Sequence, residues 1–276
     1  MWETPQRKGT DMNPLAKKKL FLFDIDGTIA IGDSLIDGTR ELLAYIDSVG
    51  GKAYYITNNS TKSNADYVER FRKVFGLETT ENLFVTSGYM TILFLKEKYA
   101  SDKIFILGTA SFVAELRKNG LNVTEQDEEG IACVVAAFDS ELNYQKLIQV
   151  CKVLSTRDVP FYATNPDLCC PIDFGFVPDC GAICQMITAS TGKEPVYLGK
   201  PSADVVRLCQ QDSHFTDEET LVVGDRLYTD IACGINAGVD TCVLYTGEAT
   251  PEEVADTPFV PSFAFADVKE LLSALY

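Results

Sequence analysis

The residues best suited to chemistry in this chain lie in the segment KLFLFDIDGT, residues 19–28. The apolar run Leu20 to Phe23 is typical of a strand buried on both faces. Alternate side chains of an extended chain share a face, so Asp24 and Asp26 are predicted to project together if the strand continues that far. Two carboxylates so close repel each other unless a cation lies between them or one holds a proton. The segment therefore predicts a charged site at a strand end, and the alternative is an ordinary acidic turn.

A second acidic strand end occurs late in the chain, in the segment GDRLYTD at residues 224–230. Asp225 follows a predicted apolar strand closely, as Asp24 does. Asp230 is expected in the first turn of the next helix, where a carboxylate could simply match the helix dipole. Carboxylate oxygens from two strand ends favour a hard cation such as Mg²⁺.

Two further groups of side chains suit an anion. Thr57 ends the strand predicted at 52–57, and Asn58 and Asn59 follow it before a predicted helix. The free N–H groups of a helix N-terminus could bind a phosphate there, although ordinary helix capping explains the same residues equally well. Lys200, within YLGKP, is predicted at a strand end, where it would supply a point charge.

Histidine and cysteine offer little for catalysis. The one histidine, His214, lies in a polar stretch that predicts a loop, so acid–base work is left to carboxylates, lysine or a metal. Nine cysteines are an odd number and favour reduced thiols in the cytoplasm. Four of them lie within one short span but lack the CxxC spacing of common zinc sites, so packing is their expected role: Cys169, Cys170, Cys180 and Cys184.

Composition argues against several classes of partner. The 276 residues include 40 acidic and 24 basic side chains, which gives a net charge of −16. This surplus argues against nucleic acid and against an anionic membrane surface. A phosphate ester would be repelled as well, so a local cation must reverse the field at the site. The apolar run before Asp24 is too short for a signal peptide or a membrane span, and residues 1–13 are predicted to be either a frayed extension or a segment partly foreign to the natural protein.

The order of predicted elements indicates an α/β protein. Helical periodicity at 39–49 and 64–75 flanks a strand at 52–57, and strands joined by helices form parallel sheets. The pattern restarts at about Phe84, which predicts a second α/β unit inserted into a Rossmann-like, doubly wound core. The predicted segments are the first part of the core, the inserted unit and the second part of the core: residues 15–83, 84–191 and 192–276.

Taken together, the four motifs resemble those of the haloacid dehalogenase superfamily of phosphotransferases. DxDGT, the Thr57 motif, Lys200 and GDxxxxD occur in the superfamily's order, each at a predicted strand end. The wordings TNNS, LGKP and GDRLYTD, with ATNPD and GFVPDCGAI in the insert, resemble the branch of 4-nitrophenylphosphatases, nucleotide phosphatases and phosphoglycolate phosphatases. The resemblance covers the chain from about Leu20 onward and implies that the insert is an α/β cap domain.

The resemblance implies a role for each acidic residue. Asp24 would attack phosphorus and become an aspartyl phosphate. Asp26 would protonate the leaving oxygen and then activate the hydrolytic water. Mg²⁺ would be held by the Asp24 carboxylate, the Asp26 backbone carbonyl and Asp225, with Asp230 acting through water.

The resemblance also implies where the substrate binds. The residues implied for the phosphoryl group are Thr57, Asn58, Asn59 and Lys200. In the cap, Asn165 and Asp167 are candidates to contact the substrate, although Asn-Pro-Asp is equally typical of a turn. Because this branch often dimerises through its caps, a homodimer is also implied.

The function predicted from these residues is Mg²⁺-dependent hydrolysis of small phosphate monoesters, such as nucleoside monophosphates, sugar phosphates or 4-nitrophenyl phosphate. A carboxylate attacking a phosphate dianion meets charge repulsion, which Mg²⁺ and Lys200 would offset. Two alternatives remain open. One is a phosphomutase on the same core, and the other is a non-catalytic protein that binds a phosphorylated metabolite.

Overall fold

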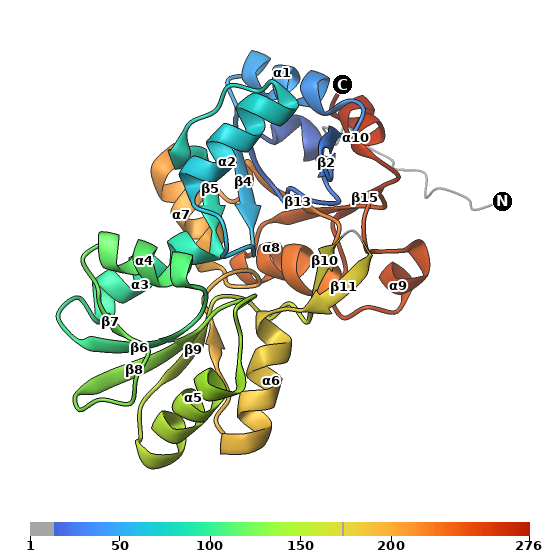
Figure 1. Ribbon diagram of the computed structural model, residues 1–276. Coiled ribbons are helices and arrows are strands. Elements are labelled where there is room, and N and C mark those ends of the chain that lie inside the picture. Colours follow the sequence, from blue (N-terminus) through green and yellow to red (C-terminus); the bar gives the residue numbers. More distant parts are fainter. Residues whose placement is uncertain (1–13, 173) are drawn as a thin grey trace.

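The computed structural model describes residues 14–172 and 174–276, so the predicted extension at 1–13 lies outside the described residues. The chain forms two lobes, each built on its own parallel sheet with helices on both faces (Figure 1). This arrangement confirms the predicted α/β class and the doubly wound core. Among the described residues, no helix has the length and apolar character needed to cross a membrane.

The first lobe contains a six-stranded parallel sheet in the order β15-β14-β13-β1-β4-β5. Strand β1 lies in the middle, between β13 and β4, although these two strands are separated by most of the chain. The register pairs Phe23 with Val223, so the chain leaves β1 and β13 at nearly the same level. The strands are β1 (Leu20–Phe23), β4 (Lys52–Thr57), β5 (Phe84–Thr86), β13 (Thr220–Gly224), β14 (Asp240–Leu244) and β15 (Phe263–Phe265).

Helices cover both faces of this sheet, as the apolar run in β1 predicts. Phe21 and Phe23 belong to a hydrophobic cluster with side chains of α1, α2 and α10. Leu20 and Leu22 point the other way, into a cluster with α7 and α8. The helices of this lobe are α1 (Thr39–Ser48), α2 (Asn64–Arg70), α7 (Asp204–Ser213), α8 (Ala232–Ala237), α9 (Pro251–Ala255) and α10 (Val268–Leu275). A π-helical turn, η2 (Phe71–Phe75), continues α2, and another, η4 (Leu227–Ile231), precedes α8.

The second lobe contains a five-stranded parallel sheet in the order β12-β9-β8-β6-β7. Side chains of α3 and α4 cover one face, and side chains of α5 and α6 cover the other. Its strands are β6 (Lys103–Leu107), β7 (Asn122–Thr124), β8 (Ile131–Ala136), β9 (Phe161–Ala163) and β12 (Val196–Tyr197). Its helices are α3 (Ser87–Lys98), α4 (Ala110–Lys118), α5 (Tyr144–Thr156) and α6 (Cys180–Thr191).

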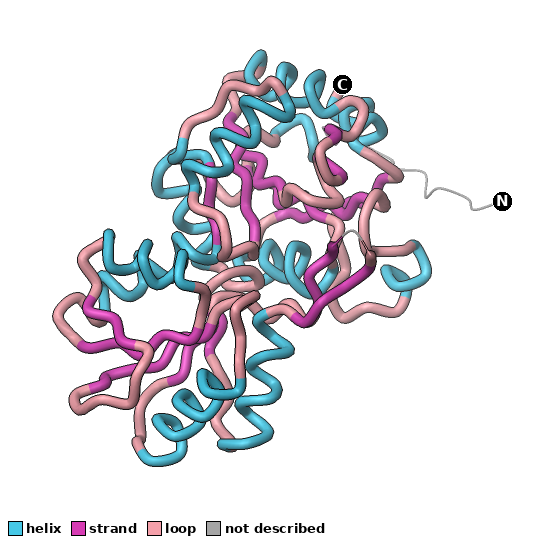
Figure 2. The backbone as a smooth tube through the Cα atoms, in the orientation of Figure 1, coloured by secondary structure: helices cyan, strands magenta, loops and turns pink. Residues whose placement is uncertain are grey.

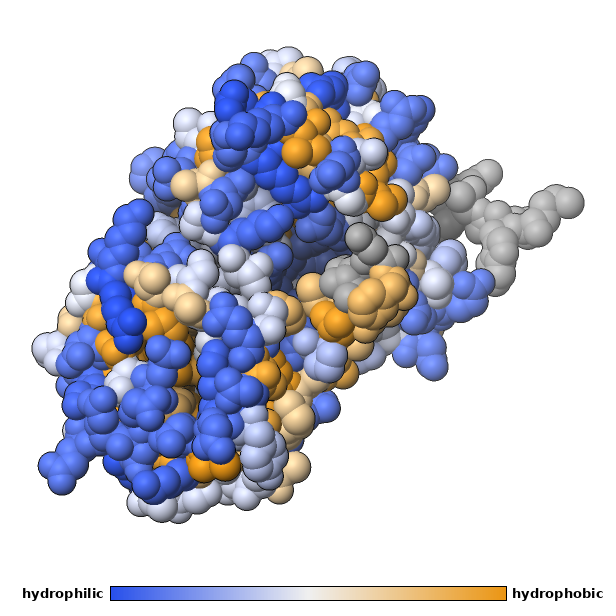
Figure 3. All heavy atoms as spheres, in the orientation of Figure 1, coloured by the Kyte–Doolittle hydropathy of each residue, from blue (hydrophilic) through white to orange (hydrophobic). Residues whose placement is uncertain are grey.

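Two short antiparallel hairpins stand apart from the sheets. The hairpin β2 (Ala30–Ile31) and β3 (Ser34–Leu35) follows the DIDGT segment. The hairpin β10 (Cys169–Ile172) and β11 (Gly175–Pro178) leaves the second lobe, and Figure 2 shows it separate from both sheets. Phe174 and Phe176 of this hairpin are largely exposed, and hydrophobic side chains gather over it in Figure 3.

Two short strands belong to a different sheet from the one that the predicted segment boundaries imply. Residues 84–86 were predicted in the insert, but they form β5, which pairs with β4 of the core sheet. Residues 196–197 were predicted in the second part of the core, but they form β12, which pairs with β9 of the second lobe. A strand of two or three residues is too short for its pattern of apolar residues to show which sheet it joins. Only the backbone hydrogen bonds to a neighbouring strand decide this. The division of the chain into a core and an inserted unit otherwise stays a prediction.

The cysteine cluster divides between the interior and the surface. Cys180 and Cys184, at the start of α6, are buried in the hydrophobic core of the second lobe. Cys169 is exposed and Cys170 is half-buried, both on the β10–β11 hairpin. Packing therefore accounts for Cys180 and Cys184.

Candidate active site

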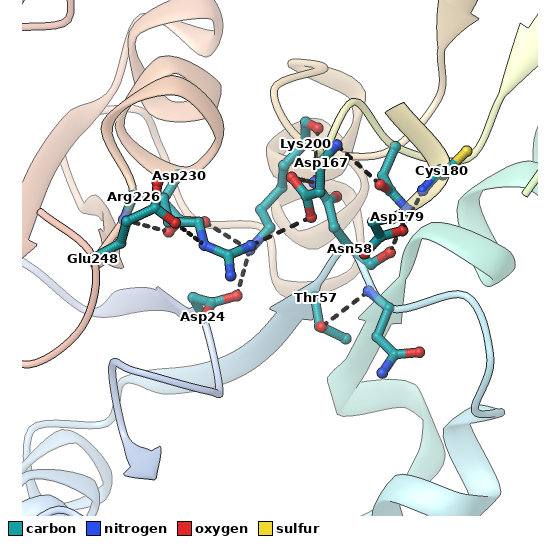
Figure 4. Close-up of polar contacts among 12 residues, drawn as sticks. Asp24, Thr57, Asn58, Asp167, Asp179, Cys180, Lys200, Arg226, Asp230 and Glu248 are labelled. Atoms are coloured by element: carbon teal, nitrogen blue, oxygen red, sulfur yellow. Dashed lines mark hydrogen bonds and ion pairs between the residues drawn. The ribbon is translucent and has the colours of Figure 1, made fainter. Parts of the chain in front are cut away.

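Three carboxylates meet at the C-terminal edge of the core sheet, and Figure 4 shows two of them, Asp24 and Asp230. Asp24 follows β1 and Asp225 follows β13, and these strands are neighbours in register. Asp230 joins them from the first turn of η4. Ligand atoms of Asp24, Asp225 and Asp230 all lie within 4.8 Å of one another. The pairing of two strands distant in sequence thus builds an acidic cluster.

Asp225 is held on both of its oxygens. The Thr28 hydroxyl donates to Oδ1 at 3.0 Å, and the backbone N–H of Glu248 donates to Oδ2 at 2.9 Å. Two glycines, Gly27 and Gly247, allow the backbone to approach the Asp225 carboxylate closely. A Cβ added to Gly27 or Gly247 would lie 2.6 or 2.0 Å from Asp225 Oδ2. Gly27 also has φ +97°, a conformation that side chains disfavour.

Lys200 lies inside the cluster and is almost fully buried. Its Nζ donates to Asp24 Oδ1 at 2.5 Å, to Asp230 Oδ1 at 2.6 Å and to the Ile56 carbonyl at 3.1 Å. These contacts use all three protons of the ammonium group. A buried charge is tolerated only when it is paired and hydrogen-bonded in this way. Burial lowers the pKa of Lys200, but Asp230 and Asp24 raise it by more, so the ammonium form is favoured.

The carboxylates themselves repel one another despite Lys200. Burial raises the pKa of Asp24 well above its usual range, and although Lys200 lowers it, Asp230 and Asp225 raise it further. Burial also raises the pKa of Asp225, with Asp230 as the next cause. A site with more negative charge than Lys200 neutralises, and with only oxygen donors, fits a hard divalent cation. Asp24, Asp225 and Asp230 are the residues that could hold it.

Asp26 does not join this cluster. Strand β1 ends at Phe23 and the chain bends at Ile25, so the extended backbone on which the paired projection of Asp24 and Asp26 depended is absent. The Asp26 side chain is 47% exposed and instead forms an ion pair with Arg70, whose Nη2 lies 2.9 Å from Oδ1. Asp26 is accordingly not among the carboxylates whose ligand atoms lie within 4.8 Å of one another.

The predicted phosphate-binding segment follows β4 but does not stand at a helix N-terminus. Helix α2 starts at Asn64, and Ser63 caps it through a reciprocal capping box with Asp66. The helix N-terminus therefore lies beyond Thr57, Asn58 and Asn59 and gives no support to a phosphate site there. Phosphate binding by these three residues stays a prediction. Asn59 Oδ1 accepts hydrogen bonds from the N–H and hydroxyl of Thr61, as in an ordinary turn.

Thr57 and Asn58 are buried, and Figure 4 shows them in the same group of polar side chains as Asp24 and Lys200. The Thr57 hydroxyl accepts a hydrogen bond from the Asn59 N–H at 3.2 Å. Asn58 Nδ2 donates to the Lys200 carbonyl at 3.1 Å and to Asp167 Oδ1 at 3.3 Å. Asn58 Oδ1 is buried and has no hydrogen-bond partner among the residues that the structure describes.

The cap residues predicted to contact substrate lie at the contact between the lobes. Asn165 Nδ2 donates to the Asn58 carbonyl at 2.9 Å, and its Oδ1 accepts from the Asp167 N–H at 3.1 Å. This local turn agrees with the turn interpretation of Asn-Pro-Asp. Burial raises the pKa of the Asp167 carboxyl, although Arg226 lowers it.

Arg226 is a residue that the sequence interpretation missed. Its Nη1 lies 3.4 Å from Asp167 Oδ2 and its Nε lies 3.0 Å from Glu248 Oε2. Figure 4 shows Arg226 and Lys200 extending toward Asp24 from two directions. Arg226 lies between the two aspartates of GDRLYTD. This position in the sequence could have indicated that Arg226 belongs to the site. It places a second cation beside the cluster and links the lobes.

Comparison with known proteins identifies the family. Residues 21–122 match the family described as haloacid dehalogenase-like hydrolase, and residues 197–271 match a second one described as HAD-hydrolase-like. An acid sugar phosphatase of Staphylococcus aureus is 32% identical over 258 residues, which cover 93% of this chain and 98% of that protein.

Solved structures agree with these matches. The 4-nitrophenylphosphatase of Thermotoga maritima superposes with a TM-score of 0.89 at 35% identity, covering 96% of this chain and all of that one. NagD from Escherichia coli K-12 superposes with a TM-score of 0.81 at 29% identity, covering 92% and 98%. The resemblance predicted from the four motifs is thereby confirmed. With its strand-end carboxylates, its buried lysine and these matches, the chain belongs to the haloacid dehalogenase-like hydrolases.

Proposed function

We propose that this protein is a phosphomonoesterase that hydrolyses small phosphorylated metabolites and requires Mg²⁺. The observation that carries the proposal is the position of Lys200, whose ammonium contacts the carboxylates of both Asp24 and Asp230. A buried cation beside a carboxylate at a strand end is what an anionic nucleophile needs to meet an anionic substrate. The names of the relatives, acid sugar phosphatase and 4-nitrophenylphosphatase, support the same substrate class.

In the proposed reaction, Asp24 is the nucleophile. A carboxylate oxygen of Asp24 bonds to phosphorus while the bond from phosphorus to the leaving oxygen breaks, which leaves an aspartyl phosphate. Water then attacks this intermediate, releases inorganic phosphate and restores the carboxylate. Division into two displacements is the usual benefit of covalent catalysis. Lys200 neutralises charge on the phosphoryl oxygens in both steps.

The proposed cation is Mg²⁺, because its preferred ligands are oxygens and it keeps several waters. Asp24, the Asp26 backbone carbonyl and Asp225 would hold it, with Asp230 acting through water. When bound, Mg²⁺ would stabilise negative charge on the transferring phosphoryl group. The net charge of −16 makes such a local cation necessary for an anionic substrate.

Asp26 is the proposed acid and base. It gives a proton to the leaving oxygen in the first displacement and takes a proton from the attacking water in the second. Its 47% exposure leaves the carboxylate accessible to a substrate between the lobes. Poor leaving groups, such as alkoxides, depend most on this proton.

Further contacts are proposed for the phosphoryl group and for the leaving group. Thr57, Asn58 and Asn59 would bind phosphoryl oxygens, and Asn165 and Asp167 would face the leaving group. Burial of Thr57 and Asn58 beside Lys200 supports the first assignment. The contact between Asp167 and Arg226 near the acidic cluster supports the second.

The protein is also proposed to act as a homodimer in the cytoplasm. The odd number of its cysteines, nine, supports a reducing compartment. Light scattering on the purified protein would measure the mass of the assembly directly.

The decisive experiment measures inorganic phosphate released from a panel of phosphate esters with and without Mg²⁺. The panel contains 4-nitrophenyl phosphate, a sugar phosphate and a nucleoside monophosphate. Stoichiometric phosphate release that is lost in Asp24→Asn is expected. Asp33→Asn, an exposed neighbour in sequence, is the matched control and should keep wild-type rates. Isomerised ester without free phosphate would identify a mutase, and no turnover across the panel would favour a non-catalytic binding protein.

A further inference from the structure

The Asp26 side chain is held by one residue that the four motifs do not include. Arg70 ends α2, 44 residues away, and its Nη2 donates to Asp26 Oδ1 at 2.9 Å while its Nη1 lies 3.5 Å from Oδ2. Two parallel contacts of this kind fix the plane of a carboxylate as well as its position. Among the described residues, Arg70 is the only side chain that hydrogen-bonds to the Asp26 carboxylate.

Arg70 is itself fixed on two further sides. Its Nη2 also donates to the Gly32 carbonyl, at the tip of the β2–β3 hairpin, at 2.7 Å. Its guanidinium carbon lies 5.2 Å from the centre of the Phe75 ring, and Phe75 is buried. The Arg70 side chain is only 14% exposed, whereas Asp26 is 47% exposed. A planar cation held by packing and by a carbonyl therefore orients a carboxylate that has few other constraints.

The neighbouring arginine shows that this arrangement is not a general property of the helix. Arg72 pairs with Glu69 three residues earlier, and the side chains of both are about half exposed. Exposed pairs of this kind contribute little to structure. Arg70 instead contacts Asp26 in the DIDGT segment, 44 residues earlier in the chain. Its contact is therefore not a local pair within the helix.

We propose that Arg70 is a positioning residue for the proton-transfer steps, because it sets the orientation from which Asp26 serves the leaving oxygen and the attacking water. The inference rests on the acid–base function proposed for Asp26. In the first displacement the bond from phosphorus to the leaving oxygen breaks, the phosphoryl group passes to Asp24, and the Asp26 proton passes to the leaving oxygen. Arg70 touches none of the reacting atoms and acts through Asp26 alone.

The test compares leaving groups. The 4-nitrophenolate ion is stable without a proton, whereas an alkoxide from a sugar phosphate is not. Arg70→Met should lower kcat/KM, which reports only the steps up to departure of the leaving group, by about 10²-fold for the sugar phosphate. This is the low end of the ~10²–10⁴-fold that proton transfer contributes, because Asp26 itself remains. It should lower kcat/KM for 4-nitrophenyl phosphate much less. Arg70→Lys should recover part of the loss, since an ammonium can pair with Asp26 but lacks the planar fork.

Arg72→Met is the matched control, because it removes an arginine of the same helical segment that does not contact Asp26. It should leave both rates unchanged. Thermal melting of each variant checks that the fold survives, and Arg70→Lys serves if Arg70→Met does not fold. A loss of kcat/KM that is equal for both substrates, or no loss for the sugar phosphate, would overturn the proposal.

A double-mutant cycle separates this proposal from the proposed function. Asp26→Asn alone should slow the sugar phosphate more than the nitrophenyl ester, and adding Arg70→Met should then have no further effect. A further loss in the double variant would show that Arg70 acts by another route and would overturn the positioning role. If Asp26→Asn leaves the sugar phosphate rate unchanged, the acid–base function itself fails. The two failures are therefore distinguishable.

Discussion

The Lys200 ammonium lies 2.5 Å from Asp24 Oδ1, although the two residues are 176 positions apart in the chain. This contact joins the first and last parts of the core at the edge of one sheet. It also places a buried positive charge beside the carboxylate that we propose as the nucleophile.

Replacement of Lys200 by methionine should nearly abolish turnover. The variant keeps the length of the side chain but leaves the carboxylates of Asp24 and Asp230 without their shared cation. We expect kcat for phosphate release to fall by about 10²–10³-fold, as when one preorganised donor is removed from a catalytic site. Lys193→Met is the control, because Lys193 pairs with the exposed Asp158 far from the cluster. Equal rates in the two variants would contradict the catalytic role of Lys200.

Replacement of Asp24 by asparagine should stabilise the metal-free protein. Burial, together with Asp230 and Asp225, holds the pKa of the Asp24 carboxyl well above its usual range even though Lys200 opposes this shift. The folded state therefore binds this proton more tightly than the unfolded state does. The contribution of Asp24 to stability is complete below its unfolded pKa of about 3.9 and is lost as pH rises through the folded pKa.

The melting temperature in EDTA measures this effect. At a pH above the folded pKa, Asp24→Asn should melt a few degrees above wild type, because ~1 kcal/mol corresponds to ~2–4 °C in a protein of this size. The difference should shrink as pH falls toward 4, where wild-type Asp24 holds its proton. A variant that melts below wild type at neutral pH, or a difference that grows in acid, would contradict this account.

Asp225 should be required for stabilisation by Mg²⁺. A cation that binds only the folded state raises the free energy of unfolding by about 2.7 kcal/mol at a concentration 100 times its Kd. Titration of EDTA-treated protein with Mg²⁺ should therefore raise the melting temperature, and Asp225→Asn should remove most of the rise. Asp217→Asn, at an exposed pair with Arg207, should keep it. The same shift in both variants would mean that the cation binds elsewhere.

Asp167 should contribute to stability through its contacts between the lobes. Its carboxylate pairs with Arg226 and accepts a hydrogen bond from Asn58, and it is almost fully buried. Asp167→Ala should lower the free energy of unfolding by ~1–3 kcal/mol, because it leaves buried polar groups without partners. Urea denaturation measures the change, with the exposed Asp158→Ala as the control, expected within ~0.5 kcal/mol of wild type. Equal effects would show that the contact is not stabilising.

Asp167→Asn gives a second comparison at the same position. The pKa of Asp167 is raised, chiefly by burial, so its charge is costly where it lies. An amide keeps the shape and can still accept from Asn58. We therefore expect Asp167→Asn to destabilise less than Asp167→Ala in the same urea titration. A larger loss for the amide would mean that the ion pair with Arg226 dominates.

Much of the fold and the chemistry of the site could be predicted from the sequence. The apolar runs before Asp24 and Asp225 indicated buried strands, and parallel strands bring their C-terminal ends to one edge. The types of residue at those ends then indicated an oxygen-rich cation site with a lysine. These features are local, because strand, strand end and side-chain type are written in a few consecutive residues.

Other relationships were decided only by the tertiary structure. Asp26 was expected beside Asp24, but the bend at Ile25 turns it toward Arg70. The very short strands β5 and β12 took sheets that their few residues could not indicate.

The sequence by itself determined which groups stand at the strand ends, since apolar periodicity and the residues that interrupt it are local properties. The tertiary structure decided which of these groups meet, including Lys200 with Asp24, Arg226 with Asp167, and Arg70 with Asp26. The physical reason is that each pair depends on strand order, backbone bends and the packing of two lobes. Strand order, backbone bends and lobe packing depend on the whole chain. They cannot be predicted from the residues next to either partner in the sequence.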